Sequence, residues 1–335
     1  MKYREAAGVR LSAIGLGCWQ FGSREWGYGE PYAKEIAPAV VRRCLDLGVN
    51  LFDTAEAYGF GRSERILGAA LGDRRPEAFV ATKLFPVLPI DPIVGRRARA
   101  SARRLDVEIL DLYQLHWPNP VVPLTKSVEA LARLRAEGLI ANVGVSNFNL
   151  AQWRRAEDLL GSPVLSNQLR YNLIDRRIER EVLPWAQEHG RLVIAYSPLA
   201  QGLLSARYGA ETTPRNLRAN SPAFLPENLR RVEPLLAALR RIAAAHGASP
   251  AQVSLAWLLR RDGVVVIPGA SSVAQAESNA TAADLELTDD EDAELTAASD
   301  AFEPVGGVEA YRTITRLAAQ RFRARLAGIA SGLRA

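Results

Sequence analysis

Short apolar runs alternate with amphipathic helical segments along this chain, and few folds accommodate that pattern. Segments such as Glu35–Leu47 and Leu124–Glu137 carry apolar residues at spacings of three and four, which is the helical period. The eight apolar runs, which we predict to be strands, are Gly15–Cys18, Asn50–Asp53, Phe79–Lys83, Asp111–His116, Ala141–Ser146, Val164–Gln168, Val193–Ser197 and Val264–Pro268. The repeating unit is therefore a strand followed by a helix.

Strands that are apolar at successive positions are buried on both faces of a sheet. Their separation by helices, at intervals of about thirty residues, indicates right-handed crossovers into a parallel sheet. Eight such units close a (β/α)8 TIM barrel, which is the α/β fold that we expect. An open doubly wound sheet is the alternative. Its glycine-rich signature is missing, because Gly15-Leu16-Gly17 is followed by Cys18-Trp19 and lacks the third glycine.

Three segments lie outside the repeat. Residues 2–12 are typical of an N-terminal hairpin at the bottom of a barrel. The stretch Ser197–Glu227 contains several prolines and glycines and forms a long loop after strand 7, as lids and ligand-binding loops do. Residues from about 300 to 335 form a C-terminal helical extension, which either covers the site, makes an oligomer contact or packs outside the barrel. We expect residues 1–335 to form a single barrel domain.

Composition narrows the class of protein. The chain has 335 residues, of which 48% are hydrophobic and 24% charged, as in globular proteins. Its formal charge is +5, but the arginines are spread over helical stretches and no binding motif accompanies them, so we expect no nucleic-acid partner. No apolar window is long enough for a membrane span, and the two cysteines favour a cytoplasmic location. With three histidines, we expect no metal site.

Polar side chains stand where the predicted strands end, which in a barrel is the edge that carries the chemistry. Asp53, Lys83 and His116 end three successive strands, and Tyr58 lies five residues beyond Asp53. Each has an ordinary structural alternative. Asp53 suits a helix cap, Lys83 a barrel-rim residue, His116 a core imidazole and Tyr58 a packed loop aromatic. Their joint occurrence at strand ends favours a catalytic site.

These residues belong to stretches that together resemble the aldo-keto reductase superfamily over residues 1 to about 295. The matching stretches are GVNLFDTAEAYG (Gly48–Gly59), ATK (Ala81–Lys83), LYQLHWP (Leu112–Pro118), IANVGVSNF (Ile140–Phe148), Asn167-Gln168, AYSPLAQGLL (Ala195–Leu204) and VIPGASS (Val266–Ser272). The resemblance implies a barrel that interconverts carbonyls and alcohols with NADPH or NADH. It also implies that Tyr58 is the acid, that Lys83 and Asp53 tune it, and that His116 orients the substrate.

Physical chemistry is consistent with these roles. Hydride transfer to a carbonyl leaves an alkoxide, so a proton donor must stand beside the carbonyl oxygen. A phenol is a weak acid at neutral pH, but a cation about 4 Å away favours its phenolate by roughly 4 kcal/mol. We therefore expect Lys83 to lower the pKa of Tyr58. A buried lysine stays charged when a carboxylate pairs with it, and Asp53 offers that partner.

The same resemblance supplies candidates for a dinucleotide site across the top of the barrel. Ser146, Asn147 and Gln168 match residues that bind the carboxamide, and Tyr196 matches the ring that stacks on nicotinamide. The pyrophosphate would be lined by Ser197, Leu199, Gln201 and Leu203.

The adenosine end departs from the commonest family pattern. Gly269 and Gln275 stand where many relatives have a lysine and an arginine that hold the 2′-phosphate. Hydroxyls and backbone N–H groups at a helix start can still bind phosphate. The resemblance to the family favours NADP(H), and the two missing charges weaken this to a slight preference over NAD(H). The remaining candidates here are Ser271, Ser272 and, for the adenine, Glu277 and Asn279.

An aromatic set surrounds the predicted site. Trp19, Trp26 and Trp117 are the candidate substrate contacts, and they suit sugar or aromatic carbonyls. The predicted partner is thus a small-molecule carbonyl or alcohol. The alternative function is a nucleotide-sensing regulatory subunit that resembles channel-associated members of the superfamily, and a third is a barrel that serves only as an interaction scaffold.

Overall fold

Eight parallel strands pair side by side in chain order. The computed structural model describes residues 1–23, 29–209, 212–214, 217–310 and 312–317. The strands are β3 (Leu16–Gly17), β4 (Leu51–Asp53), β5 (Phe79–Leu84), β6 (Leu110–Leu115), β7 (Ile140–Ser146), β8 (Ser166–Arg170), β9 (Leu192–Tyr196) and β10 (Val264–Val266). The first and last strands also meet, because the Gly15 N–H donates to the Val266 carbonyl (2.7 Å) and the Gly17 N–H to the Pro268 carbonyl (3.1 Å). The sheet closes on itself, which confirms the predicted (β/α)8 barrel.

Glycine is required where the barrel closes. A Cβ on Gly17 would lie 2.7 Å from the Ile267 carbonyl oxygen, which is closer than real Cβ contacts. Gly17 also forms a parallel bridge with Gly269 in the loop after β10. Small residues therefore let the two end strands approach, and the Gly15-Leu16-Gly17 pattern serves the barrel and not a dinucleotide turn.

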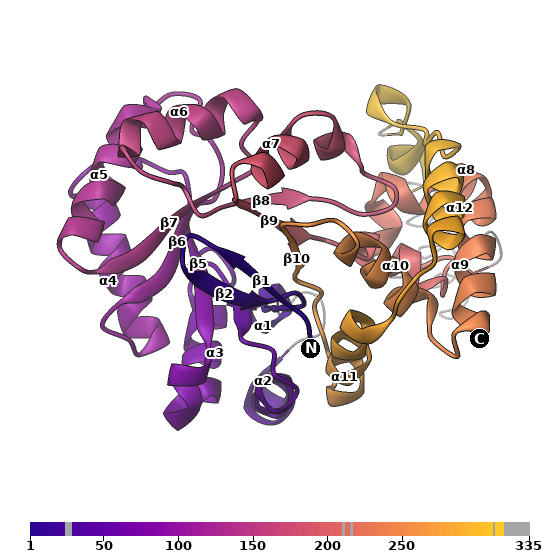
Figure 1. The fold of residues 1–335 in the computed structure, drawn as a ribbon, viewed down its shortest axis with the longest axis horizontal. Helices are drawn as coiled ribbons and strands as arrows, with labels where there is room; N and C mark the ends of the chain where they lie inside the picture. The colour runs from indigo at the N-terminus through magenta and orange to yellow at the C-terminus, as the bar shows by residue number, and fades with distance from the viewer. Residues whose placement is uncertain (24–28, 210–211, 215–216, 311, 318–335) are drawn as a thin grey trace, which may run out of the picture. The chain divides into compact units, whose positions relative to one another are not determined.

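Helices follow the strands and lie outside them (Figure 1). They are α1 (Trp19–Gly22), α2 (Ala37–Asp46), α3 (Arg62–Leu71), α4 (Ile93–Leu105), α5 (Leu124–Ala136), α6 (Leu150–Leu160), α7 (Val182–Glu188), α10 (Pro250–Leu259) and α11 (Val273–Thr281). Apolar strand residues fill the interior, among them Leu51, Leu112, Leu192 and Val265, all of them buried. Burial on both faces explains why the strands read as continuous apolar runs.

The predicted N-terminal hairpin is present as β1 (Tyr3–Ala6) and β2 (Val9–Ser12), which pair antiparallel. Leu11 joins the interior cluster and is completely buried. The Ser12 N–H donates to Asn50 Oδ1 (2.6 Å), and Asn50 directly precedes β4. The hairpin therefore covers the end where the strands begin, and leaves the end where they finish for the polar side chains.

The chain groups into two compact units. The first, Met1–Pro198 with Gln252–Leu287, holds the barrel, and the second holds Leu199–Ala251 with Thr288–Ala335. The second contains α8 (Pro226–Arg231), α9 (Glu233–Ala245) and α12 (Asp289–Asp300). The described residues of the predicted long loop after strand 7 include three 3-10 turns, η5 (Ala200–Ser205), η6 (Leu217–Asn220) and η7 (Pro222–Phe224). The single-domain organisation stays a prediction.

The C-terminal extension starts within the second unit. Asn228 of α8 makes two hydrogen bonds to the backbone of Val305 in this extension. The Asn228 amide nitrogen donates to the Val305 carbonyl (3.0 Å), and the Asn228 amide oxygen accepts the Val305 N–H (2.7 Å). Helical residues follow at 307–310 and 312–317, and the rest of the extension lies outside the described residues.

Candidate active site

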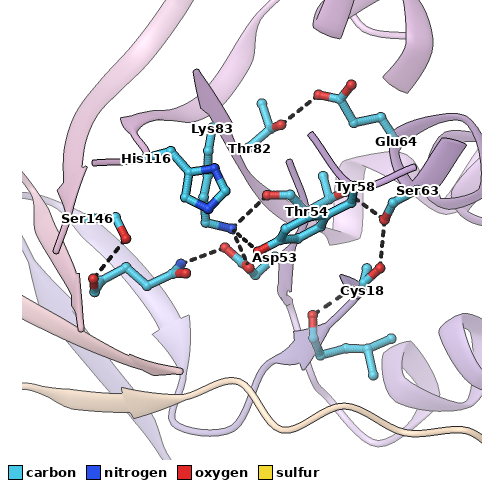
Figure 2. Close-up of polar contacts among 12 residues, drawn as sticks. Cys18, Asp53, Thr54, Tyr58, Ser63, Glu64, Thr82, Lys83, His116 and Ser146 are labelled. Carbon is cyan, nitrogen blue, oxygen red and sulfur yellow. Dashed lines mark hydrogen bonds and ion pairs between the residues drawn. The ribbon is translucent and has the colours of Figure 1, made fainter. Parts of the chain in front are cut away.

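The carboxyl ends of neighbouring strands bring the predicted catalytic side chains together (Figure 2). Asp53 is the last residue of β4, Lys83 the last but one of β5, and His116 directly follows β6. Because β4, β5 and β6 are adjacent and parallel, their ends share one edge of the barrel. Tyr58 reaches this edge from the loop that follows β4.

Lys83 is the centre of the cluster. Its ammonium lies 2.6 Å from Asp53 Oδ1, 2.8 Å from the Thr54 carbonyl oxygen and 3.3 Å from the Tyr58 hydroxyl oxygen. The side chain is completely buried, and these three acceptors occupy its three donors. The other carboxylate oxygen of Asp53 accepts a hydrogen bond from the Gln168 amide (2.7 Å). Asp53 therefore binds Lys83 and does not cap a helix; the next helix, α3, begins after Gly61.

The loop that carries Tyr58 is fixed by a close backbone approach. A Cβ on Gly22 would lie 2.5 Å from the Tyr58 carbonyl carbon, so only glycine admits this contact. Beyond Tyr58, Gly59 and Gly61 both adopt positive φ, which turns the chain into α3. The glycines around Tyr58 thus set the position of the phenol.

His116 lies in an aromatic setting. Its ring stacks on Trp117 at 3.7 Å between centroids and meets the edges of Tyr58 (5.9 Å) and Phe85 (6.2 Å). Its Nδ1 is buried and has no hydrogen-bond partner in the described part of the chain. Phe85 was not among the sequence candidates, although its place two residues after Lys83 in a strand-end loop is a usable signal.

Burial and the Lys83 charge determine the protonation states. Burial disfavours the Lys83 ammonium, but Asp53 and Tyr58 outweigh it and raise the pKa of Lys83. Burial raises the pKa of Tyr58, and the opposing effect of Lys83 does not reverse the shift. Lys83 does act to lower the pKa of Tyr58, as expected, but desolvation raises this pKa by more, so the net shift is opposite to the one we expected. Burial and, to a lesser extent, Lys83 lower the pKa of His116 to about 2, so the imidazole is neutral.

The residues expected to bind the nicotinamide lie at or near the carboxyl ends of β7, β8 and β9, and hydrogen bonds connect several of them. The Ser146 hydroxyl donates to the Gln168 carbonyl (2.9 Å), and the Asn147 amide donates to the His116 carbonyl (3.1 Å). The Tyr196 hydroxyl donates to Asn147 Oδ1 (3.0 Å), while its ring is partly exposed. These donors, acceptors and the open ring face fit an amide-bearing aromatic ring beside the Lys83 cluster.

The candidates for the pyrophosphate divide between the two units. Ser197 belongs to the first, where its carbonyl accepts a hydrogen bond from the Asn172 amide (2.9 Å). Leu199, Gln201 and Leu203 belong to the second, at and within the 3-10 segment η5 (Ala200–Ser205). Their role at a cofactor stays a prediction.

The adenosine candidates lie in the loop after β10 and along α11. Ser272 caps this helix, and Gln275 Oε1 accepts from the Ser271 N–H (2.8 Å) and hydroxyl (2.9 Å). The Asn279 amide lies 3.3 Å from the Gly269 carbonyl oxygen. Glu277, expected at the adenine, instead pairs with Arg43 of α2 (2.7 Å). A Cβ on Gly269 would meet the Gln20 side chain at 2.8 Å, so a lysine there would have to displace it.

Of the substrate candidates, Trp19 and Trp117 are both 41% exposed, and Trp26 lies outside the described residues. Within the described ranges, no cluster of side chains has the composition of a metal site. No helix in the described part of the chain is both long and apolar enough to cross a membrane.

Comparison with known proteins identifies the family of this chain. The sequence pattern of the Aldo/keto reductase family matches residues 13–300. An uncharacterized oxidoreductase of Mycobacterium tuberculosis is 54% identical over 306 residues, which are 91% of this chain and 95% of the relative. A methylglyoxal reductase of Escherichia coli is 34% identical and covers 84% of this chain and 88% of its own.

Solved structures show the same likeness. A glycerol dehydrogenase from Gluconobacter oxydans superposes with a TM-score of 0.83 at 31% identity, over 91% of this chain and 97% of its own. An aldo/keto reductase from Klebsiella pneumoniae in complex with NADP and acetate gives 0.74 at 32% identity, over 88% and 94%. The barrel fold and these relatives define a nicotinamide-dependent oxidoreductase. The chain belongs to the aldo/keto reductase family.

Proposed function

We propose that this protein reduces a small-molecule aldehyde or ketone by direct hydride transfer, and that Tyr58 is the general acid in reduction and the general base in the reverse direction. The observation that carries the proposal is the Lys83 ammonium, which binds the Asp53 carboxylate and the Tyr58 hydroxyl at once, beside a neutral His116.

In this proposal the substrate carbonyl oxygen lies between the Tyr58 hydroxyl and the His116 imidazole. A neutral imidazole carries one N–H and donates one hydrogen bond, which orients the carbonyl and polarises it. The nicotinamide, when bound, supplies the hydride. Tyr58 gives its proton to the oxygen as negative charge develops there, and the Lys83 ammonium stabilises the phenolate that is left. Asp53 keeps Lys83 charged throughout.

Ser146, Asn147, Gln168 and Tyr196 would hold the nicotinamide, and the start of α11 the adenosine phosphate. The Klebsiella pneumoniae relative in complex with NADP supports an NADP(H) preference. The absence of lysine and arginine at Gly269 and Gln275 acts against it, so we propose that NADP(H) is preferred only slightly.

The cofactor preference can be shifted at Gln275. We expect Gln275→Arg to raise the kcat/KM ratio of NADPH over NADH by about tenfold, because a guanidinium binds a phosphate dianion through charge-assisted hydrogen bonds. The matched control is Gln275→Leu, which removes the two hydrogen bonds to Ser271 without adding charge. If both variants change the ratio equally, position 275 does not face the 2′-phosphate.

The test of the proposed function is a fluorescence titration with NADH and NADPH, followed by a panel of aldehydes, ketones and alcohols. Carbonyl-dependent cofactor oxidation at about 1 per second or faster supports the proposal. Binding of cofactor with negligible turnover on every carbonyl contradicts it and favours a nucleotide-sensing role.

A further inference from the structure

A partly buried carboxylate joins the loop of Tyr58 to the loop that follows Lys83. Glu56, three residues after Asp53 and two before Tyr58, accepts the Phe85 backbone N–H at 2.6 Å. Glu56 also accepts two hydrogen bonds from the Arg97 guanidinium, one from Nε (3.1 Å) and a shorter one from a terminal nitrogen. The Glu56 side chain is 12% exposed and that of Arg97 22%.

The Arg97 guanidinium extends this contact along the second loop. It donates to the Phe85 carbonyl (2.7 Å) and to the Val87 carbonyl (2.7 Å). Phe85 is thus held at both its N–H, by Glu56, and its carbonyl, by Arg97. From the other side, the Asn119 amide donates to the Pro86 carbonyl (2.6 Å). Surface loops usually leave such backbone groups to water, so an ion pair devoted to them indicates a loop whose position matters.

The loop held in this way has an unusual composition. Residues 85–90 read FPVLPI and contain no polar side chain. Phe85, Val87 and Leu88 are 37%, 56% and 55% exposed. The Phe85 ring makes T-shaped contacts with both His116 (6.2 Å between centroids) and Trp117 (5.7 Å), so this apolar surface adjoins the imidazole. Exposed apolar side chains grouped beside the imidazole offer a surface for an apolar ligand.

We propose that the Glu56–Arg97 ion pair is a positioning clamp, which holds the apolar loop 85–90 against His116 and thereby selects carbonyl compounds with an apolar alkyl or aryl body. The inference rests on the proposed function and narrows it. From the sequence we expect sugar or aromatic carbonyls as substrates, and the apolar loop favours the apolar compounds among them. Glu56 and Arg97 touch no reacting atom and act through Phe85.

The experiment compares propanal with octanal at saturating cofactor. For the unmodified protein we expect kcat/KM to rise by about tenfold or more from propanal to octanal, because each additional buried methylene contributes to binding. We expect Arg97→Gln to abolish most of this rise, mainly by raising KM for octanal, with a clearly smaller change for propanal. Arg97→Lys keeps the charge but cannot span both carbonyl oxygens and the carboxylate, so its effect should be intermediate.

The matched control is Arg99→Gln. Arg99 lies on α4, as Arg97 does, and the substitution removes its surface ion pair with Glu137 (2.7 Å). It should leave the octanal-to-propanal ratio unchanged. Phe85→Ala removes the ring and leaves the Glu56–Arg97 ion pair in place, and it should also lower the octanal-to-propanal ratio of kcat/KM. If Arg97→Gln does not fold, the result for Phe85→Ala tests the inference. Equal losses on both aldehydes, or no dependence on chain length in the unmodified protein, would overturn the inference and leave the proposed function intact. Absence of turnover on every carbonyl would instead remove the proposed function itself.

Discussion

Tyr58→Phe is expected to lower the rate of carbonyl reduction by roughly 100-fold or more, with cofactor affinity nearly unchanged. The substitution removes the Tyr58 hydroxyl, which lies 3.3 Å from the Lys83 ammonium, and keeps the ring that packs against His116. The proton donor is lost while the packing stays. Single-turnover measurement of cofactor oxidation, together with a fluorescence titration of cofactor binding, measures both effects.

Tyr113→Phe is the matched control for Tyr58→Phe. Its hydroxyl is also buried, but it has no hydrogen-bond partner in the described residues, so its removal should leave the rate near that of the unmodified protein. The pH profile adds a second check. Because burial raises the pKa of Tyr58, the phenol keeps its proton at neutral and mildly alkaline pH, and reduction should be flat from about pH 6 to 9. A Tyr58→Phe enzyme with an unchanged rate would exclude Tyr58 as the acid.

Much of the barrel could be predicted because its strands are buried on both faces. This burial produces apolar runs that stand out from amphipathic helices, and each predicted strand overlaps an observed one. The ends of the helices were predicted less well. The predicted helix Glu35–Leu47, for example, begins inside a π-helical turn (Tyr32–Ile36) that precedes α2. Hydrogen bonds at helix starts depend on tertiary contacts that periodicity does not contain.

The catalytic candidates could be predicted for a related reason. A charged residue at the end of an apolar strand is conspicuous, and parallel strands place such ends together. The Glu56–Arg97 clamp could not be found in this way, because its partners are separated by 41 positions and each alone resembles a surface charge. The direction of the Tyr58 pKa also escaped prediction, since it depends on how completely the loop buries the phenol.

The close packing at Gly269 is a third feature that sequence comparison missed. In the sequence, Gly269 indicates only a missing phosphate-binding lysine. In the structure, the absence of a Cβ at Gly269 makes room for the Gln20 side chain. The amide of Gln20 donates a hydrogen bond to the Ala270 carbonyl (2.8 Å). A substitution at a binding position can thus be a packing requirement from a distant segment. This is why the cofactor test is designed at Gln275.

Lys83→Met is expected to lower both activity and stability, and the two effects can be separated. It removes the cation beside Tyr58, which at this separation favours the phenolate by roughly 4 kcal/mol, so reduction should slow by about 100-fold or more. It also leaves the Asp53 carboxylate, which is 2% exposed, without its ionic partner. Breaking a buried ion pair from one side typically costs about 3–5 kcal/mol in the free energy of unfolding.

The double variant Lys83→Met with Asp53→Asn distinguishes these contributions. It removes both charges, so urea denaturation should show that part of the lost stability returns, because no unpaired carboxylate remains buried. Activity should stay low, since the phenolate still lacks its cation. If the double variant regains activity along with stability, Lys83 acts only as a structural partner of Asp53. If stability returns and the rate does not, the ammonium acts on the proton transfer from Tyr58.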